Sequence, residues 1–183
     1  MMLMKKTDSL LLIIDVQERL APAMDNPREV INGCATLLGV AQDLGVPCVI
    51  SEQYPQGLGQ TMVDLRNELA PDSTYFPKIE FSCWQNEKIA QEIKKHNKKQ
   101  IIIAGVETHI CVVQTAIDLK NAGYDVFVVS NACSSRNQLN HVLGLQRLMH
   151  SGVEVVNTEM VIFEWLEKAG SPEFKTISRK YVI

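Results

Sequence analysis

The sequence lacks the patterns that mark disulfide-rich, zinc-knuckle and membrane proteins. Its five cysteines stand singly at positions 34, 48, 83, 111 and 133, and no two form a CxxC pair. This odd number of isolated cysteines favours neither a disulfide framework nor a zinc knuckle, so we expect reduced thiols, most of them packed in the core. No apolar run approaches the roughly 20 residues that a membrane helix needs. Residues 1–12 lack the layout of a signal peptide, so we expect a cytoplasmic protein with no membrane partner.

The sequence also lacks an excess of charge of one sign. The formal net charge is −3, and acidic and basic residues are interspersed, so we expect no nucleic-acid partner. Four lysines do cluster between positions 94 and 99, but they flank a predicted helix end, where positive charge suits the helix dipole. The chain has 183 residues, of which 46% are hydrophobic and 21% charged. These values predict a single globular domain over residues 1–183.

Short apolar runs alternate with helical patterns along the whole chain. One clear helix begins at Pro27 after Asn26 and is stopped by Gly45. The predicted strands are Ser9–Ile14, Val46–Ile50, Thr74–Phe76, Gln100–Ala104, Tyr124–Val129 and Val153–Val156. This alternation predicts an α/β fold, with a six-stranded, mainly parallel sheet between two helix layers in a three-layer, Rossmann-like α/β/α arrangement.

Three residues that can carry chemistry fall where predicted strands end. Asp15 follows the first strand, Lys78 lies just past the third, and Cys111 opens the helix after the fourth. Ligands of such sheets bind outside the carboxyl ends of the strands. A thiol to attack, a carboxylate to take its proton and an ammonium to stabilise both anions together suggest nucleophilic catalysis. The helix N-terminus and Lys78 are expected to lower the pKa of the thiol.

Each of these residues also has a plain structural interpretation. An aspartate after a buried strand often marks only the boundary with water. A lysine beyond a strand is usually solvated, and a cysteine near a helix start is usually packed. The turn GVET before Cys111 adds a functional signal, because the backbone N–H groups of Glu107 and Cys111 could receive the oxyanion of a tetrahedral intermediate.

With these residues in view, the chain resembles the isochorismatase-like cysteine hydrolases, a superfamily that includes nicotinamidases and N-carbamoylsarcosine amidohydrolase. The matching segments are LLIIDVQ, FPKIEFS, GVETHICVVQTAIDL, CSSRN and SGVEVVNTEMVIFEWL, which together span nearly the whole chain. The resemblance implies a catalytic triad of Asp15, Lys78 and Cys111. It also implies a cis peptide between Val106 and Glu107, and no cofactor.

The same resemblance suggests residues around the reacting groups and an assembly state. We expect substrate contacts from Gln17, which could instead fix the turn, and from Tyr54 and Phe81. Members of the superfamily commonly form dimers or tetramers, so a homo-oligomer is expected. The apolar tail 181–183 could lie in an interface between subunits or pack on its own subunit.

The sequence departs from two branches of this superfamily. Nicotinamidases hold a metal through an aspartate and two histidines after the second strand, but the first histidine here is His96. The corresponding loop begins Ser51-Glu52-Gln53-Tyr54, so we expect no metal and do not expect nicotinamide as the substrate. Isochorismatases proper lack the nucleophilic cysteine, so Cys111 argues against cleavage of a vinyl ether.

The sequence thus predicts a hydrolase that cleaves an amide-type C–N bond of a small molecule through a thioester on Cys111. Two alternatives remain open at this point. One is a non-catalytic interaction or regulatory protein that retains the fold. The other is a redox protein in which Cys133 resolves an oxidised Cys111. The identity of the substrate is beyond the sequence, because the pocket walls come from loops.

Overall fold

A computed structural model describes residues 2–70 and 73–182. The sheet has six strands, all parallel, in the order β3-β2-β1-β4-β5-β6. The strands are β1 (Ser9–Ile14), β2 (Cys48–Gln53), β3 (Tyr75–Lys78), β4 (Gln100–Val106), β5 (Asp125–Ser134) and β6 (Glu154–Val156). The predicted α/β fold is therefore confirmed. β2 and β3 lie on one side of β1 and β4, β5 and β6 on the other, so the strand order reverses between β1 and β4.

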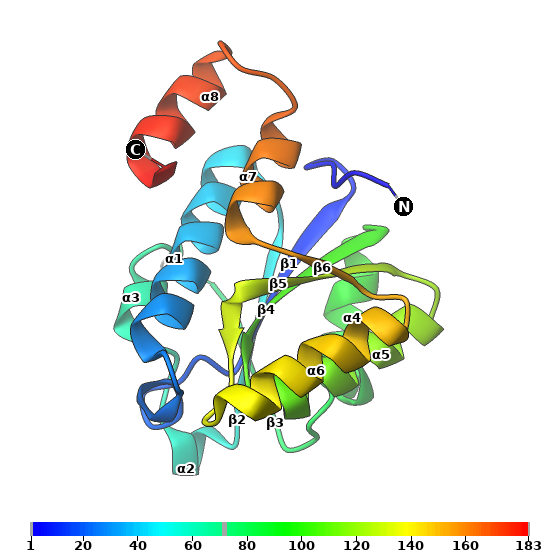
Figure 1. The fold of residues 1–183 in the computed structure, drawn as a ribbon. Coiled ribbons are helices and arrows are strands. Elements are labelled where there is room, and N and C mark those ends of the chain that lie inside the picture. The colour runs from blue at the N-terminus through cyan, green and yellow to red at the C-terminus, as the bar shows by residue number, and fades with distance from the viewer. Residues whose placement is uncertain (1, 71–72, 183) are drawn as a thin grey trace.

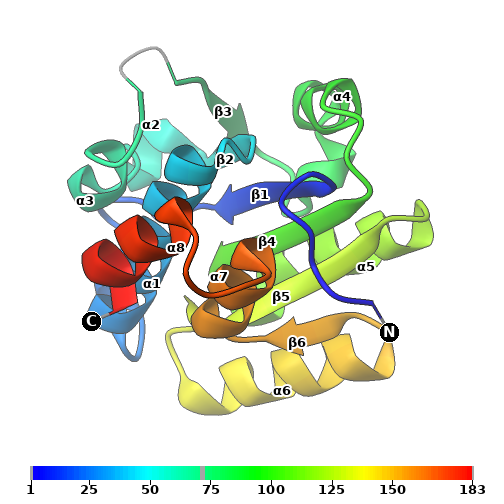
Figure 2. The ribbon, with the colours of Figure 1, turned by 90° about the horizontal axis from the view of Figure 1, so that it is seen from above.

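Helices cover both faces of this sheet (Figures 1 and 2). The longer ones are α1 (Pro27–Leu44), α4 (Glu87–Lys95), α5 (Val113–Asn121), α6 (Gln138–His150) and α7 (Thr158–Leu166). Short turns of helix are η1 (Ala21–Ala23), α2 (Pro55–Leu58), α3 (Val63–Arg66), η2 (Cys83–Gln85), the π-helical η3 (Thr108–Val112), α8 (Pro172–Ile177) and η4 (Ser178–Val182). The sequence did not predict α8. Within the described residues, no helix combines the length and apolarity that crossing a bilayer requires.

The alternation of side chains along β1 divides the core into two halves. Leu11 and Ile13 pack with α1 and α7 on one face of the sheet, whereas Leu10, Leu12 and Ile14 pack with α4 and α5 on the other. Because both faces are covered, β1 reads as an unbroken apolar run rather than as an alternating one. Burial of this strand on both sides fixes the position of Asp15 at its end.

Local signals explain which helix boundaries the sequence predicted correctly. Gly45 ends α1 in the left-handed conformation with φ 70°, as predicted. Asn86 caps α4 by accepting a hydrogen bond from the N–H of Ile89. Thr61 donates its hydroxyl to the carboxylate of Glu52, and the N-cap residue of α3 is Met62.

Four strands run further than the sequence suggested, and β4 continues past Ala104 to Val106. β2 continues through Gln53, and Lys78 is the last residue of β3 rather than a residue beyond it. The polar segment 130–134, which lies beyond the predicted strand end at Val129, continues β5. It does so because it pairs with β4, where Cys133 lies opposite Gly105 after an irregularity in the register.

The two ends of the described chain both lie far from the carboxyl ends of the strands, on opposite sides of the molecule (Figures 1 and 2). Figure 1 shows both termini at the top and α2, which follows β2, at the bottom. Tyr181 and Val182 pack against the core of their own chain, in favour of the second of the two placements considered for the tail. Ile183, the last residue of that tail, lies outside the described residues.

Candidate active site

The structure brings Asp15, Lys78 and Cys111 together at the carboxyl edge of the sheet. The Lys78 ammonium donates to Asp15 Oδ2 at 2.7 Å and lies 3.7 Å from Cys111 Sγ. The side chains of Lys78 and Asp15 are fully buried, and Cys111 is only 5% exposed. A carboxylate, an ammonium and a thiol are therefore in contact, in a site from which most water is excluded.

Backbone geometry aims Asp15 and Cys111 at each other. Asp15 adopts φ 56°, a left-handed conformation that aspartate tolerates, and there the chain turns sharply at the end of β1. Cys111 was predicted to open a regular helix, but it lies inside the π-helical turn Thr108–Val112, which runs directly into α5. Turns of π-helix are rare in proteins, and those that occur often lie at functional sites.

Gly105 is required where β4 passes β1. Its φ is 124°, and a Cβ at this position would lie 2.1 Å from the carbonyl oxygen of Ile14. No side chain fits there, so β4 approaches the end of β1 closely. The peptide bond between Val106 and Glu107 is cis. The backbone N–H of Glu107 donates to no acceptor among the described residues, which leaves it available to an oxyanion.

Lys78 is held by more than its ion pair. Its ammonium also donates to Gln53 Oε1 at 2.5 Å and to the carbonyl oxygens of Glu80 and Phe81 at 3.2 and 3.3 Å. Ammonium groups have three protons to donate, and here the four oxygens and the sulfur surround them. Lys78 therefore has one fixed position between the carboxylate and the thiol.

Sequence reasoning missed Ser51, Gln53 and Cys83. Ser51 donates its hydroxyl to Asp15 Oδ1 at 2.7 Å, and the thiol of Cys83 lies 3.4 Å from the same hydroxyl. The segment from Ser51 was read as a loop, whereas it continues β2. Alternate residues of a strand share a face, so the strand assignment would have placed Ser51 and Gln53 together toward Asp15.

Burial governs the electrostatics of the site. It raises the pKa of Asp15 above its ordinary value, although Lys78 opposes this. Burial lowers the pKa of Lys78, but its interactions with Asp15, Cys83 and Cys111 together raise it further, so the net direction is upward. Lys78 therefore stays charged, and Asp15 is a stronger base than an exposed aspartate.

The thiol of Cys111 does not follow the expectation from its position near a helix start. Burial raises the pKa of Cys111, the Asp15 carboxylate raises it as well, and Lys78 lowers it only in part. The resting thiol is therefore protonated, and our expectation of a lowered pKa is wrong. The helix position alone could not reveal this, because the shift depends on how completely the fold removes water from the sulfur.

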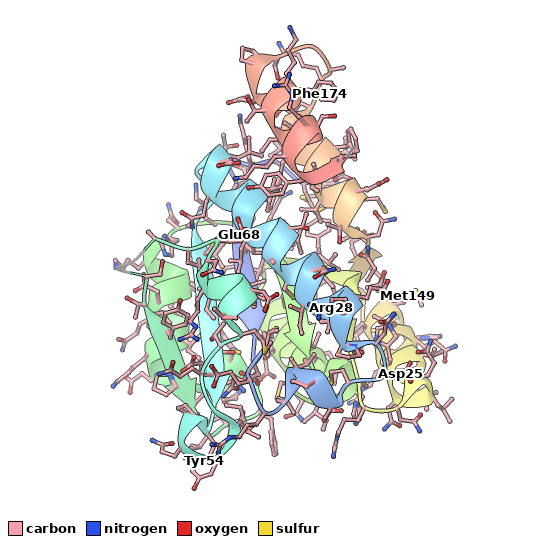
Figure 3. All side chains as sticks on the ribbon, turned by 90° about the vertical axis from the view of Figure 1, so that its left-hand side faces the viewer. Asp25, Arg28, Tyr54, Glu68, Met149 and Phe174 are labelled. Carbon is pink, nitrogen blue, oxygen red and sulfur yellow. The ribbon has the colours of Figure 1, made fainter. Side chains whose placement is uncertain are left out.

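The three expected substrate contacts have different surroundings. Gln17 is fully buried, and its amide donates to the carbonyl oxygens of Gln53 and Gly59 and accepts from the Gln53 N–H. Its polar atoms are used within the protein, which favours the second of the two roles considered for Gln17, fixing the loop, and a contact with substrate stays a prediction. Tyr54 and Phe81 are 56% and 55% exposed, and Figure 3 shows Tyr54 at the tip of the carboxyl edge.

A shallow pocket lies next to Lys78 at this edge. It has a volume of about 200 Å³ and is lined by Tyr54, Pro55, Gln56, Pro77, Lys78, Ile79 and Asn86. Ile79 is 76% exposed, so an aromatic and an aliphatic side chain stand in solvent beside the pocket. Exposed apolar groups around a pocket are typical of a surface that a ligand or a partner covers.

The last residues of β2 do not fit the metal site of nicotinamidases. Ser51 is bound to Asp15, Gln53 is bound to Lys78, and the carboxylate of Glu52 accepts from the N–H and hydroxyl of Thr61 at 2.7 and 2.8 Å. Within residues 2–70 and 73–182, no three His, Cys, Asp or Glu side chains gather as a metal site requires.

The surroundings of Cys133 do not favour a reactive thiol. It is 5% exposed in β5, burial raises its pKa to about 12, and it interacts with Cys34. The thiol that shares the surroundings of Cys111 is that of Cys83, whose pKa is raised by burial to about 11. Burial and the raised pKa of Cys133 therefore give no support to its resolving role.

Known proteins resemble this chain over most of its length. The isochorismatase domain family matches residues 9–160. The secreted isochorismatase effector Isc1 of Phytophthora sojae is 37% identical over 179 residues, which cover 93% of this chain and 83% of that protein. The structure of the MAR1 ribonuclease from Caenorhabditis elegans is 30% identical and has a TM-score of 0.91, covering 97% of this chain and 91% of that one.

A third relative carries a covalent adduct. YcaC from Pseudomonas aeruginosa, in a structure with hexane-2,5-diol and covalent acrylamide, is 25% identical. Its TM-score is 0.90, and the match covers 98% of this chain and 91% of that one. The match to the domain family and the relatives above 30% identity lead to one conclusion: the chain belongs to the isochorismatase family.

Proposed function

We propose that this protein is a cysteine hydrolase that cleaves an amide-type C–N bond of a small molecule. Membership of the isochorismatase family supports a hydrolase. The observation that carries the finer proposal is the position of the Lys78 ammonium, 2.7 Å from Asp15 Oδ2 and 3.7 Å from Cys111 Sγ. A protonated thiol beside a buried carboxylate of raised pKa is suited to proton transfer at the moment of attack.

In this mechanism Asp15 transfers two protons in turn, the first from the thiol to the leaving nitrogen and the second from water to the departing thiolate. Asp15 accepts the proton of Cys111 as the sulfur attacks the carbonyl carbon, and the N–H groups of Glu107 and Cys111 receive the oxyanion. Asp15 then gives the proton to the leaving nitrogen, so that an amine departs and a thioester remains. Water, deprotonated by Asp15, attacks the thioester and releases a carboxylic acid. The proton returns to the thiol.

Lys78 stabilises the charges through these steps. It keeps the Asp15 carboxylate ionised in a buried site and lies beside the sulfur as negative charge develops there. Ser51 orients the other carboxylate oxygen by donating to it. The Tyr54 and Phe81 side chains stand near the proposed entrance and remain our candidates for substrate contact, and we propose chemistry that uses neither a metal nor another cofactor.

A panel of small amides, including primary amides, carbamoyl amines and formamides, tests the proposal. The unchanged protein should hydrolyse at least one of them. Cys111→Ala should reduce kcat by about 10⁴-fold or more, because no other group supplies the nucleophile, while circular dichroism stays unchanged. A Cys111→Ala variant with full activity on that amide rules the mechanism out. If the protein hydrolyses none of the amides and iodoacetamide does not alkylate Cys111, the non-catalytic alternative is favoured.

Cleavage of RNA is a second candidate, because the relative from Caenorhabditis elegans is named a ribonuclease. The net charge of −3 and the buried thiol favour a small neutral substrate over a polyanion. Incubation with a single-stranded RNA oligonucleotide separates the two candidates. RNA cleavage that persists in purified Cys111→Ala would replace the amide proposal, whereas intact RNA supports it.

We further propose that the protein forms dimers or tetramers. Leu139, Leu143 and Met149 along α6 are each more than half exposed, an arrangement typical of a face that a second subunit covers. Light scattering after gel filtration tests this, and a monomeric mass contradicts it. We also propose a cytoplasmic location, since all five cysteines are free thiols.

A further inference from the structure

The turn that precedes Cys111 is held by side chains from a distant segment. Residues 134–141, at the end of β5 and the start of α6, contact each of the residues 107–109. Thr108 donates its hydroxyl to the Ser134 carbonyl oxygen at 3.0 Å. His141 Nδ1 lies 2.9 Å from the same hydroxyl oxygen. Because the hydroxyl proton is already used, we assign the second proton to His141, whose Nδ1–H donates to Thr108. His109 Nδ1 lies 2.9 Å from the Ser135 hydroxyl.

The contact between Arg136 and Glu107 stands out among these. The guanidinium Nε donates to both carboxylate oxygens of Glu107, at 3.1 and 3.2 Å, and the Arg136 backbone N–H donates to one of them at 2.9 Å. The Glu107 side chain is 6% exposed, whereas that of Arg136 is 62% exposed. The exposed Arg136 side chain thus binds the buried carboxylate of Glu107. The backbone N–H of the same residue, Glu107, is the proposed oxyanion donor.

We propose that Arg136 is a positioning residue for the oxyanion hole. It touches neither the thiol nor Asp15 among its described hydrogen bonds, and it acts by fixing the orientation of the Glu107 peptide. The charged Nε–H group, shared between both carboxylate oxygens, and the backbone N–H hold the carboxylate from two directions, which a single hydrogen bond does not. This inference rests on the proposed function, because an oxyanion hole matters only if an acyl group is transferred.

Two reactions of the Cys111 thiol distinguish an effect on the oxyanion hole from an effect on the thiol itself. With p-nitrophenyl acetate, the sulfur bonds to the carbonyl carbon through an oxyanion, p-nitrophenolate leaves, and water later releases acetate from the thioester. With iodoacetamide, the sulfur bonds to the methylene carbon and iodide leaves, so no oxyanion forms. A change in Arg136 that misaligns the oxyanion donor should slow the first reaction and leave the second unchanged.

The experiment compares Arg136→Gln, Arg136→Lys and the control Arg28→Gln in the full chain. Arg28 is the matched control because its side chain is 76% exposed and its pair with Asp64 is long, at 3.9 Å. We expect Arg136→Gln to slow acylation of Cys111 by about 10- to 100-fold, the effect of a misplaced catalytic group. Arg136→Lys should lie between Arg136→Gln and the unchanged protein, since lysine keeps the positive charge but has no Nε–H group at the same place.

Alkylation by iodoacetamide, measured on the Cys111 peptide by mass spectrometry, should be the same in all four proteins. Equal acylation rates in Arg136→Gln and the unchanged protein overturn the positioning role. A parallel loss of acylation and alkylation also overturns it, because it points to general damage. If Arg136→Gln does not fold, the ratio of the two rates in Arg136→Lys decides. No acylation of Cys111 in the unchanged protein overturns the proposed function as well, so the two failures are distinguishable.

Discussion

Replacement of Lys78 by methionine would test the buried ion pair at the centre of the site. Methionine keeps most of the volume but removes the charge that balances Asp15. Both side chains of the pair are fully buried, and loss of one partner from such a pair typically costs about 3–5 kcal/mol. The exposed pair of Lys95 and Glu92 is the control, because Lys95→Met should lower the free energy of unfolding by less than about 1 kcal/mol.

The pH dependence of this loss identifies its cause. Without Lys78, burial raises the folded-state pKa of Asp15 further above the unfolded value of about 3.9. The folded state then binds more protons than the unfolded state, so its stability is greatest below the unfolded pKa and falls as the pH rises through the folded pKa. The loss in Lys78→Met should therefore be smaller at pH 5 than at pH 8, by up to about 1.4 kcal/mol for each pH unit of the titration.

Urea denaturation at both pH values, followed by the fluorescence of the buried Trp165, measures the effect. The double variant Asp15→Asn with Lys78→Met should recover much of the loss at pH 8, because it buries no unpaired charge. A loss below about 1 kcal/mol, or an equal loss at both pH values, would refute the reasoning.

Three other perturbations test separate parts of the structure. Gln17→Ala should lower the free energy of unfolding by about 2–4 kcal/mol, since three hydrogen bonds are lost from buried groups, and should speed hydrogen exchange at the Gln53 amide; unchanged exchange contradicts a loop-fixing role. Gly105→Ala should prevent stable folding, as judged by circular dichroism, because its Cβ would lie 2.1 Å from the Ile14 carbonyl oxygen; a normal melting curve contradicts this. Alkylation of Cys111 by iodoacetamide should still accelerate above pH 9.0, the ordinary thiol pKa, because burial raises the pKa of this thiol; a plateau below that pH contradicts a protonated resting thiol.

The parts of the fold that the sequence predicted are those set by local signals. The end of α1 follows from the left-handed preference of Gly45, and β1 from a run of apolar residues. Segment 130–134 carries polar residues and reads as a turn, but pairing with β4 keeps it extended. Such pairing joins residues far apart in the chain, and a local pattern contains no signal for it.

The candidate site was predicted at the level of residue types and strand ends, and not at the level of contacts. Asp15, Lys78 and Cys111 were found because the carboxyl ends of parallel strands meet at one edge. The sequence left open whether Gln17 contacts the substrate or fixes the turn, and it did not indicate that the pKa of Cys111 is raised. Both depend on which atoms water cannot reach, a property of the packed fold.

The distance of both termini from the carboxyl edge of the sheet has a practical consequence for binding assays. Figure 1 places the two ends of the described chain on the side opposite α2 and the candidate site. A biotin or an affinity tag at either end would orient the protein on a sensor surface with the thiol facing the solution. Amides dissolved in that solution could then be screened for binding without steric interference from the support.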